Sequence, residues 1–593
     1  MTITDEIGLR PGRRQLLRAG GALATAAWLP AWAQPLSTGL LPSAELSGED
    51  IHLRIAHRML TIDGRASHAV AVNGTVPAPL IRLREGQNVR LHVENALDEE
   101  SSIHWHGLLV PFHMDGVPGI SFPGIKPRST FTYEFPIRQA GTYWYHSHSG
   151  LQEQMGLYGP IVIEPAEIDP VAATREHVIV LSDHSPIHPH AIFRKLKQQG
   201  GYFNYQKQTL AGLLAGRDQR EAERLSWGAM RMDPADVADV TGATYTYLVN
   251  GHGPRDNWTG LFVPGERVRL RIVNASAMTT FNLRIPGLTM TVIAADGLPV
   301  RPVSVDEMQV AVAETYDVIV EPRDDRAYAL VGESVDRSGM ALATLAPRAG
   351  MRATPPALRA RPLATMKDMG MGAMGGTATP AAACAPEHAA MGHCAASAGG
   401  GHDMAAMDHS MRDFANAPEV KRTPTVQTIA PMPVDRTGEP GQGLADVGHR
   451  VLTYRDLVAT TRNPDVRAPD RALRIHLTGN MERYMWAFDG EKLNEVTAPF
   501  AFLKDERVRV TLVNDTMMGH PIHIHGHFFE LVTGHGDHAP RKHTVQVQPG
   551  GTVTFDITAD AVGDWAFHCH MLYHMHAGMM QVVSVRPRDE VPA

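Results

Sequence analysis

The chain has 593 residues, of which 43% are hydrophobic and 20% are charged, and its formal net charge is −8 at pH 7. A chain of this length folds as several domains rather than around one core. The negative charge gives no electrostatic reason to expect nucleic acid or an anionic membrane surface as a partner, so we exclude both.

Residues 1–33 predict an export signal. Arg13 and Arg14 precede a short apolar run, and Ala31 and Ala33 give the small-x-small pattern of a cleavage site. The run is shorter than the roughly 20 apolar residues of a spanning helix, so an anchor is the weaker alternative and we expect no membrane span in the mature protein. The paired arginines resemble a twin-arginine signal, which indicates a bacterial periplasm.

Three alternating segments predict strands of a repeated domain. They are GQNVRLHVENA from Gly86, GERVRLRIVNA from Gly265 and DERVRVTLVND from Asp505, and each alternates apolar with polar residues after a turn residue. A second repeat places residues 131–148 over residues 553–570 without a gap. We therefore predict three β-sandwich domains, at residues 45–167, 168–350 and 446–593.

Two stretches depart from the strand pattern. Residues 186–230 have helical periodicity, and we expect them to form a loop-and-helix addition to the second domain. A linker at residues 351–445 contains a segment with few large apolar side chains, which we expect to be disordered or loosely ordered.

Methionines and histidines alternate in this linker segment. Thioether and imidazole groups together suit Cu(I), so we favour metal capture over a plain tether. The residues concerned are Met366, Met369, Met371, Met374, Met391, Met404, Met407, Met411, His388, His393, His402 and His409. Cys384 and Cys394 lie in the same segment, and the sequence leaves open whether they form a disulfide or bind copper.

Four His-x-His pairs lie at matching points of the first and third domains. Residues i and i+2 of a strand face the same way, so each pair places two imidazoles on one surface. Aligned through the repeats, His104 and His106 correspond to His523 and His525, and His146 and His148 to His568 and His570. Such a cluster can hold about three metal ions. The second domain has Leu283 and Ile285 in place of the first pair, so we expect a structural role for it.

Cys569 lies between His568 and His570, so its sulfur points to the opposite side of the strand. Two imidazoles, this thiolate and a more distant thioether form the ligand set of a blue-copper electron-transfer centre, and the residues are His520, Cys569, His574 and Met579. The first domain has poor copper ligands at the four matching positions, which are Ser101, Ser147, Gln152 and Leu157. We therefore expect one such centre, in the third domain.

The motifs HWHG, HSH, HPIHIHGH and HCHMLYHMHAGM resemble those of the three-domain multicopper oxidases over nearly the whole mature chain. The paired arginines, the GYFNYQKQTL segment and the Met-rich insert are most similar to the periplasmic copper-resistance protein A group. The resemblance implies an all-β fold of three cupredoxin-like Greek-key β-sandwich domains, with a Met/His-rich, disordered insert between the second and third.

The resemblance also implies four copper ions per chain. A type 1 copper would bind His520, Cys569 and His574, with Met579 axial, and a type 2 copper would bind His104 and His523. A type 3 pair would bind His106, His146, His148, His525, His568 and His570. Asp115 matches an acidic position that relays protons in related oxidases, although an Asp before Gly is also an ordinary turn residue. A second acidic residue of some relatives is Met575 here, which puts the usual proton route in doubt.

The implied function is an oxidase with Cys569 and Asp115 as catalytic residues. It would couple one-electron oxidation of Cu(I), and of phenolic compounds, to four-electron reduction of dioxygen to water, and so serve copper resistance. Met571, Met575, Met580 and His576 are candidates either for docking the reductant or for packing around the type 1 site. Periplasmic copper-handling proteins are candidate partners. A broad laccase and a copper-sequestering binding protein remain alternatives.

Overall fold

The structure is a computed structural model that describes residues 45–169, 171–371 and 411–589. The signal predicted at residues 1–33 lies outside the described residues, as do Cys384, Cys394 and the rest of residues 372–410. No helix in the described part of the chain has both the length and the apolar character needed to cross a bilayer.

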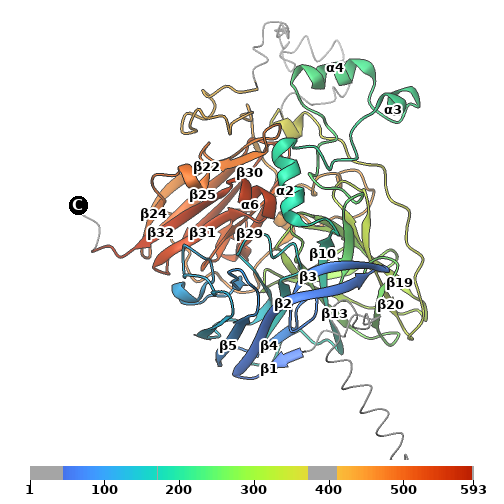
Figure 1. The fold of residues 1–593 in the computed structure, drawn as a ribbon, viewed down its shortest axis with the longest axis vertical. Helices are drawn as coiled ribbons and strands as arrows, with labels where there is room; N and C mark the ends of the chain where they lie inside the picture. The colour runs from blue at the N-terminus through green and yellow to red at the C-terminus, as the bar shows by residue number, and fades with distance from the viewer. Residues whose placement is uncertain (1–44, 170, 372–410, 590–593) are drawn as a thin grey trace, which may run out of the picture. The chain divides into compact units, whose positions relative to one another are not determined.

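The first domain is a β-sandwich of a five-stranded sheet, ordered β1-β4-β9-β8-β6, and a four-stranded sheet, ordered β3-β2-β5-β7. Figure 1 shows its early strands, β1 to β5, in blue. Inward-facing residues of both sheets, among them Ile51, Val89 and Ile161, form one core. The strands are β1 (Glu45–Ser47), β2 (Asp50–Ile62), β3 (Arg65–Val72), β4 (Leu80–Arg84), β5 (Asn88–Asn95), β6 (His104–His106), β7 (Ser129–Pro136), β8 (Gly141–His146) and β9 (Tyr158–Glu164).

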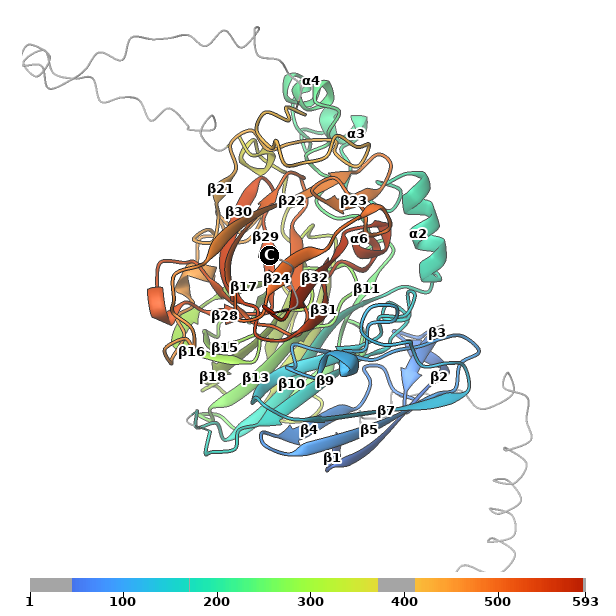
Figure 2. The same ribbon diagram turned by 90° about the vertical axis from the view of Figure 1, so that its left-hand side faces the viewer.

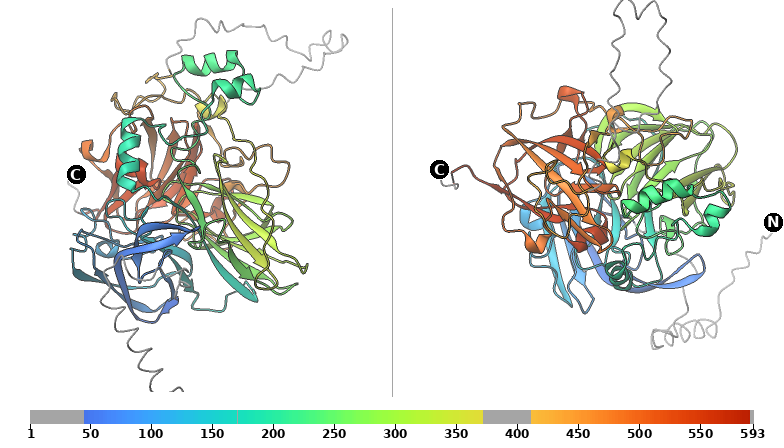
Figure 3. Two further views of the ribbon diagram at one scale, coloured as in Figure 1. Left: turned by 45° about the vertical axis from the view of Figure 1, so that its right-hand side comes forward. Right: turned by 90° about the horizontal axis from the view of Figure 1, so that it is seen from above.

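The second domain has a six-stranded sheet, β11-β10-β13-β18-β15-β16, and a five-stranded sheet, β12-β20-β19-β14-β17. Its strands are β10 (Arg175–His184), β11 (Thr246–Val249), β12 (Trp258–Leu261), β13 (Val268–Asn274), β14 (Phe281–Arg284), β15 (Met290–Ala295), β16 (Leu298–Val305), β17 (Glu307–Val310), β18 (Thr315–Val320), β19 (Tyr328–Ser334) and β20 (Met340–Ala346). The predicted helical addition is confirmed as α2 (Pro189–Gln198), α3 (Leu210–Leu214) and α4 (Glu221–Ala229). Figure 3 shows α3 and α4 side by side, apart from α2.

The third domain pairs a seven-stranded sheet, ordered β23-β22-β25-β30-β27-β28 with β21 beside β30, with a five-stranded sheet, ordered β24-β32-β31-β26-β29 (Figure 2). Its strands are β21 (Val434–Asp435), β22 (Arg471–Asn480), β23 (Met485–Phe488), β24 (Phe500–Leu503), β25 (Arg507–Asn514), β26 (His520–Ile524), β27 (Phe529–Leu531), β28 (Arg541–Lys542), β29 (Thr544–Val547), β30 (Gly551–Thr558), β31 (Gly563–Cys569) and β32 (Met580–Arg586). One helix, α6 (Leu572–Ala577), follows β31.

The predicted repeat is confirmed by strand pairing. The three repeated segments form β5, β13 and β25. Each pairs in parallel with a long earlier strand of its domain, which is β2, β10 or β22, and antiparallel with a later one. The second repeat likewise gives β7 followed by β8, and β30 followed by β31. The equivalent ends of β8 and β31 therefore carry the second His-x-His pair of each domain.

The linker between the second and third domains is irregular but packed where it is described. Residues 366–371 include the 3-10 helix η3 (Lys367–Met369), and Met369 is buried. Beyond residue 411, Ala417, Val420 and Ile429 form a small core of their own. The described ends of the Met/His-rich insert are thus ordered, and the domain boundaries stay predictions.

Candidate metal centres

The His-x-His pairs lie at the ends of adjacent strands. In the first domain β6 pairs with β8, so that His104 lies opposite His146. In the third domain β26 pairs with β31, so that His523 lies opposite His568. The same register recurs because both pairs come from the same repeat.

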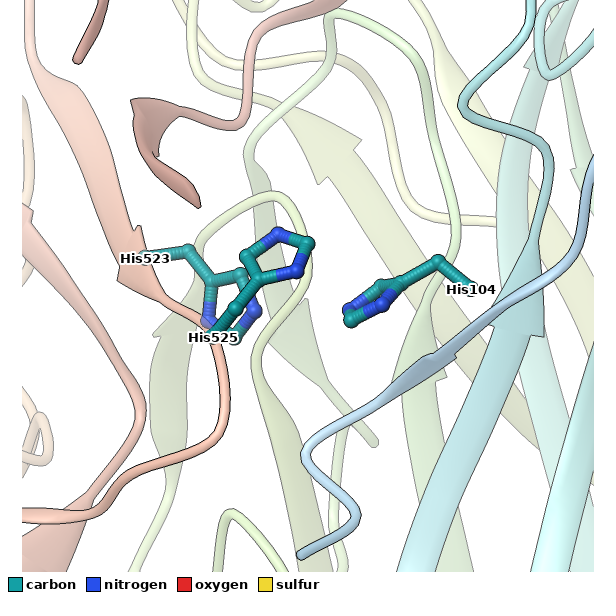
Figure 4. A group of neighbouring side chains, drawn as sticks. All are labelled: His104, His523 and His525. Atoms are coloured by element: carbon teal, nitrogen blue, oxygen red, sulfur yellow. The ribbon is translucent and has the colours of Figure 1, made fainter. Parts of the chain in front are cut away.

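The two domains bring their eight histidines together into one cluster. Rings of different domains stack, with centroid separations of 3.9 Å both for His104 and His525 and for His106 and His523. Figure 4 shows His104, from the first domain, pointing toward His523 and His525 of the third. All eight are buried except His148, which is half-buried. Imidazole nitrogens lie within 4.8 Å of one another in several groups of three, for example His148, His525 and His568.

Most nitrogens that face the interior of this cluster have no hydrogen-bond partner among the described residues. They are His104 Nε2, His106 Nδ1, His146 Nε2, His148 Nε2, His523 Nε2 and both nitrogens of His570. His525 Nε2 and His568 Nε2 face each other at 3.1 Å. A buried polar atom without a hydrogen-bond partner costs about 1–3 kcal/mol of stability. A group of such nitrogens in one place therefore indicates that they bind a metal ion.

The opposite nitrogens of the same rings are fixed by the protein. His523 Nδ1 donates to the backbone oxygen of His543 at 2.7 Å, and His568 Nδ1 donates to that of Cys569 at 3.0 Å. His106 Nε2 lies 3.2 Å from Thr544 Oγ1. Such outer contacts set the tautomer and the orientation of a metal-binding imidazole.

Asp115 contacts one histidine of each domain. Its Oδ2 lies 2.9 Å from His525 Nδ1, and its backbone oxygen accepts from His104 Nδ1 at 2.7 Å. Burial alone would raise the pKa of this carboxyl, but His525 and His104 outweigh it and the pKa is lowered. A charged carboxylate therefore spans the junction of the first and third domains.

Two residues beside the cluster have no recognisable pattern in the sequence. The Glu153 carboxylate lies 2.7 Å from His146 Nδ1 and is buried, and burial, with Asp183 nearby, raises its pKa well above the usual range. His543 is a ninth imidazole beside the eight; it is buried and lies 4.9 Å from His106 between ring centroids. Each is a single residue outside any His-x-His pair, so no spacing could have indicated it.

A second group of ligands lies on the other side of β26 and β31. Cys569 Sγ is 3.6 Å from His520 Nδ1 and 3.9 Å from His574 Nδ1, and these two nitrogens are 3.2 Å apart. His520 and His523 are three residues apart on β26, so they face opposite sides, as Cys569 and His568 do on β31. All three ligand side chains are fully buried, and burial raises the pKa of the thiol.

Met579 is brought to this centre by the turn after α6. Gly578 ends the helix with φ +130°, and a Cβ there would come within 2.7 Å of the Trp486 backbone oxygen, so only glycine fits. The Cys569 backbone N–H then donates to the Met579 oxygen at 3.1 Å. Met579 is fully buried.

The surroundings of the Cys569 centre fix both imidazoles. His520 Nε2 lies 2.8 Å from Thr516 Oγ1, and His574 Nε2 lies 2.8 Å from Asp239 Oδ2. Burial raises the pKa of Asp239 to about 7. Asp239 belongs to the second domain, so this domain has more than the structural role that we expected of it.

The first domain fills the equivalent position with hydrogen bonds. The Ser101 and Ser147 hydroxyls both donate to Gln152 Oε1, at 2.7 and 3.0 Å, and Leu157 is fully buried. These polar groups satisfy one another without an ion. The contrast with the third domain supports a single centre of this kind in the described residues.

The candidate docking residues after Cys569 mainly pack. Met575 and Met580 belong to a small cluster with Val117 and Ala566, and Met571 is buried. His576 alone is exposed. Of the two alternatives, docking of the reductant or packing around the type 1 site, these contacts favour packing for Met571, Met575 and Met580.

Comparison with known proteins gives consistent matches. Family models described as multicopper oxidase match residues 54–168, 176–349 and 467–589. The copper resistance protein A homolog of Pseudomonas syringae pv. tomato is 47% identical, with 94% of this chain and 95% of that protein covered. Copper resistance protein A of Escherichia coli is 45% identical, with 97% and 99% covered. A laccase structure from Botrytis aclada aligns with a TM-score of 0.60 at 21% identity, over 92% of this chain and 88% of that one, which shows a shared fold.

Proposed function

This chain belongs to the multicopper oxidase family, and from that premise we propose that its two ligand groups hold four copper ions. In this proposal His520, Cys569, His574 and Met579 would hold the type 1 copper. The type 2 copper binds His104 and His523. The type 3 pair binds His106, His146, His148, His525, His568 and His570.

The donor atoms fit copper in both places. A thiolate with two imidazoles and a thioether favours a soft, redox-active ion, while a cluster of imidazoles also suits copper. The partnerless nitrogens of the cluster, including those of His104 and His570, are the atoms that such ions would satisfy. Copper held at Cys569 would accept electrons one at a time from the reductant, and copper held at the histidine cluster would pass four of them to dioxygen.

The protein's own groups position these ligands and keep water out. Asp239 and Thr516 hold the Nε2 atoms of His574 and His520, which leaves both Nδ1 atoms directed at the Cys569 sulfur. Asp115 holds a ligand of each domain, and its Oδ1 has no hydrogen bond among the described residues. We assign proton transfer toward the cluster to this carboxylate.

We propose Cu(I) as the physiological substrate, with phenolic compounds as further reductants. Four Cu(I), one dioxygen and four protons give four Cu(II) and two waters. Relatives named copper resistance protein A, at 47% and 45% identity over nearly the whole chain, support a role in copper resistance. The predicted twin-arginine signal supports a periplasmic location for this activity, and we propose periplasmic copper-handling proteins as its partners.

The observation that carries the proposal is that Cys569 and its neighbours His568 and His570 face two separate ligand groups from one strand. About four copper ions per chain and an intense blue colour are expected of the metal-loaded protein. The Cys569→Ser variant should lose the colour and the turnover of both Cu(I) and phenols, measured by dioxygen uptake, while it keeps copper at the histidine cluster.

Four results would contradict the proposal or redirect it. Colourless metal-replete protein, or a Cys569→Ser variant that stays blue, would rule out the type 1 assignment. Phenol oxidation without Cu(I) oxidation would indicate a broad laccase. A catalytically inactive Cys569→Ser variant that still gives cells full copper tolerance would indicate a sequestering protein.

A further inference from the structure

A pocket of about 360 Å³ lies where the first domain meets the start of α2 in the second domain. Figures 1 and 2 both show α2 next to β3, which contributes one wall. None of the proposed copper ligands lines this pocket. Its lining includes four other imidazoles, those of His57, His68, His188 and His190. The pocket therefore collects histidines from two domains.

The four imidazoles form two close pairs. His57 on β2 and His68 on β3 face the same side of their sheet, with ring centroids 4.7 Å apart. His188 and His190 flank Pro189, the first residue of α2, and their rings stack at 5.4 Å. Burial lowers the pKa of His68, and so do its neighbours His57 and His188. His68 therefore lies close to both pairs.

The nitrogens of these rings are available to an ion. The rings of His57, His68 and His190 form no hydrogen bond within the described part of the chain. His188 Nδ1 accepts the backbone N–H of His190 at a long 3.3 Å. All four side chains are exposed, so an ion can enter from solvent and the rings can turn toward it. The lowered pKa of His68 favours a neutral ring with a free lone pair at pH 7.

The charges around the pocket favour a divalent cation. Three carboxylates line it, those of Asp98, Glu99 and Glu100, and no lysine or arginine of the described residues does. Arg128 pairs with Asp98 at 2.7 Å, which leaves two carboxylates without an ion pair there. Burial lowers the pKa of His188, whereas Glu99 raises it, so this carboxylate lies near the imidazoles. The carboxylates also offset the positive end of α2.

The donor atoms distinguish between the two oxidation states of copper. Imidazole with carboxylate suits borderline divalent ions such as Cu(II), Zn(II) and Ni(II), and Cu(II) binds most tightly among them. Cu(I) prefers thiolate and thioether ligands, and Met155 supplies the single sulfur of the lining. The pocket therefore favours Cu(II).

We propose that this pocket is a Cu(II)-binding site that bridges the first and second domains, with His57, His68 and His188 as ligands and Glu99 beside them. The site is separate from the four proposed copper positions and goes beyond the proposed function. The ion enters and leaves as Cu(II), so binding involves no electron transfer. Cu(II) is also the product of the proposed reaction, and only a role in holding that product rests on the proposed function.

The test is a Cu(II) titration of the full-length, copper-loaded enzyme, followed by calorimetry and by electron paramagnetic resonance of the added ion. The pocket variant His57→Gln, His68→Gln, His188→Asn should bind one Cu(II) fewer than the wild type. The nitrogen couplings of that ion should disappear with it. Asn keeps a side-chain acceptor at the start of α2. The histidines of residues 372–410 are the same in every variant, so any Cu(II) that they bind cancels in the difference.

A matched control removes an equally close pair of imidazoles from the same sheet. His52 on β2 and His92 on β5 stack at 4.7 Å but do not line the pocket. The variant His52→Gln, His92→Gln should bind as much Cu(II) as the wild type. The single variants His68→Gln and His188→Asn each remove a ligand of a different domain. Each should weaken binding by at least the roughly tenfold that loss of an outer contact costs a metal site.

Three results would overturn the proposal. The first is unchanged Cu(II) stoichiometry in the pocket variant, and the second is an equal loss in the control variant. The third is wild-type affinity in His188→Asn, which would remove the second domain from the site. Failure of the proposed function is a separate result. A wild-type enzyme that oxidises neither Cu(I) nor a phenol would refute the oxidase, while the Cu(II) titration would still decide whether the pocket binds the ion.

Discussion

Replacing Lys542 by Met should destabilise the protein strongly, because this lysine is the ion-pair partner of two buried carboxylates. Its Nζ lies 3.0 Å from Asp296 Oδ1 and 3.1 Å from Glu314 Oε1, and all three side chains are at most 1% exposed. Burial lowers the pKa of Lys542, but Asp296 and Glu314 outweigh it, so the pKa is raised and the group is charged. Asp296 Oδ2 also accepts the backbone N–H groups of His543 and Thr544.

Removing one partner from a buried ionic group costs about 3–5 kcal/mol, since the remaining charges lose their compensation. At roughly 2–4 °C per kcal/mol for a domain of this size, the melting temperature should fall by about 6–20 °C. The measurement is thermal unfolding of the variant and the wild type, each with and without copper. Because Asp296 holds the backbone of Thr544, copper binding at the histidine cluster should weaken as well.

Two further variants separate charge from packing. Neutralising both carboxylates in the same chain, as Lys542→Met with Asp296→Asn and Glu314→Gln, should recover much of the loss, because uncharged groups of similar volume replace a buried ion group at little cost. The exposed Lys504→Met should change stability by less than about 0.5 kcal/mol. A Lys542→Met variant that loses less than about 1 kcal/mol, or a triple variant less stable than the single one, would refute the reasoning.

Three other predictions address the cluster, its packing and the effect of pH. Asp115→Asn should lower copper affinity at the histidine cluster about 10- to 100-fold while the blue colour remains, measured by copper content after dialysis against a chelator; full retention would contradict the positioning role. Gly107 has φ +81°, and a Cβ there would come within 2.8 Å of His543 Cδ2. Gly107→Ala should therefore lower the free energy of unfolding by about 2–4 kcal/mol. A melting temperature equal to that of the wild type would refute this prediction. Burial lowers the pKa of His184 from 6.5 to about 4. Between these pH values the imidazole is protonated in the unfolded chain but neutral in the folded one. Stability is therefore lost as pH falls from 6.5 toward 4. His184→Gln should remove up to about 3 kcal/mol of that loss, as followed by denaturant unfolding at pH 7 and pH 4.5; equal pH dependence in both proteins would show that His184 is not responsible.

The parts of the structure that could be predicted from the sequence are those with a period. The three strands β5, β13 and β25 alternate apolar with polar residues, and this alternation follows directly from the geometry of a half-buried strand. The same geometry places Cys569 opposite its neighbours His568 and His570. The spacing of these residues was therefore enough to predict two ligand groups on opposite sides of the strand.

Contacts made by single residues could not be predicted in this way. Asp239 reaches His574 across 335 residues of sequence, and nothing near Asp239 marks it as a partner of a histidine. The sequence around Lys542 is that of an ordinary strand with an exposed charged residue. The side chain is nevertheless fully buried, because it pairs with two acidic groups of the second domain. Such residues acquire their surroundings only when the domains pack, which a local pattern does not record.

The division of the histidine cluster between the first and third domains has a consequence for biogenesis. Half of its imidazoles lie before residue 150, and the other half lie between residues 523 and 570, so they are synthesised much later. A truncated chain that ends before β31 keeps six of the eight imidazoles and lacks His568 and His570, so the histidine cluster is complete only once β31 and the residue after it have been made. The copper content of a preparation therefore reports on how many of its chains contain β31. A preparation that includes shortened chains should contain less copper per chain.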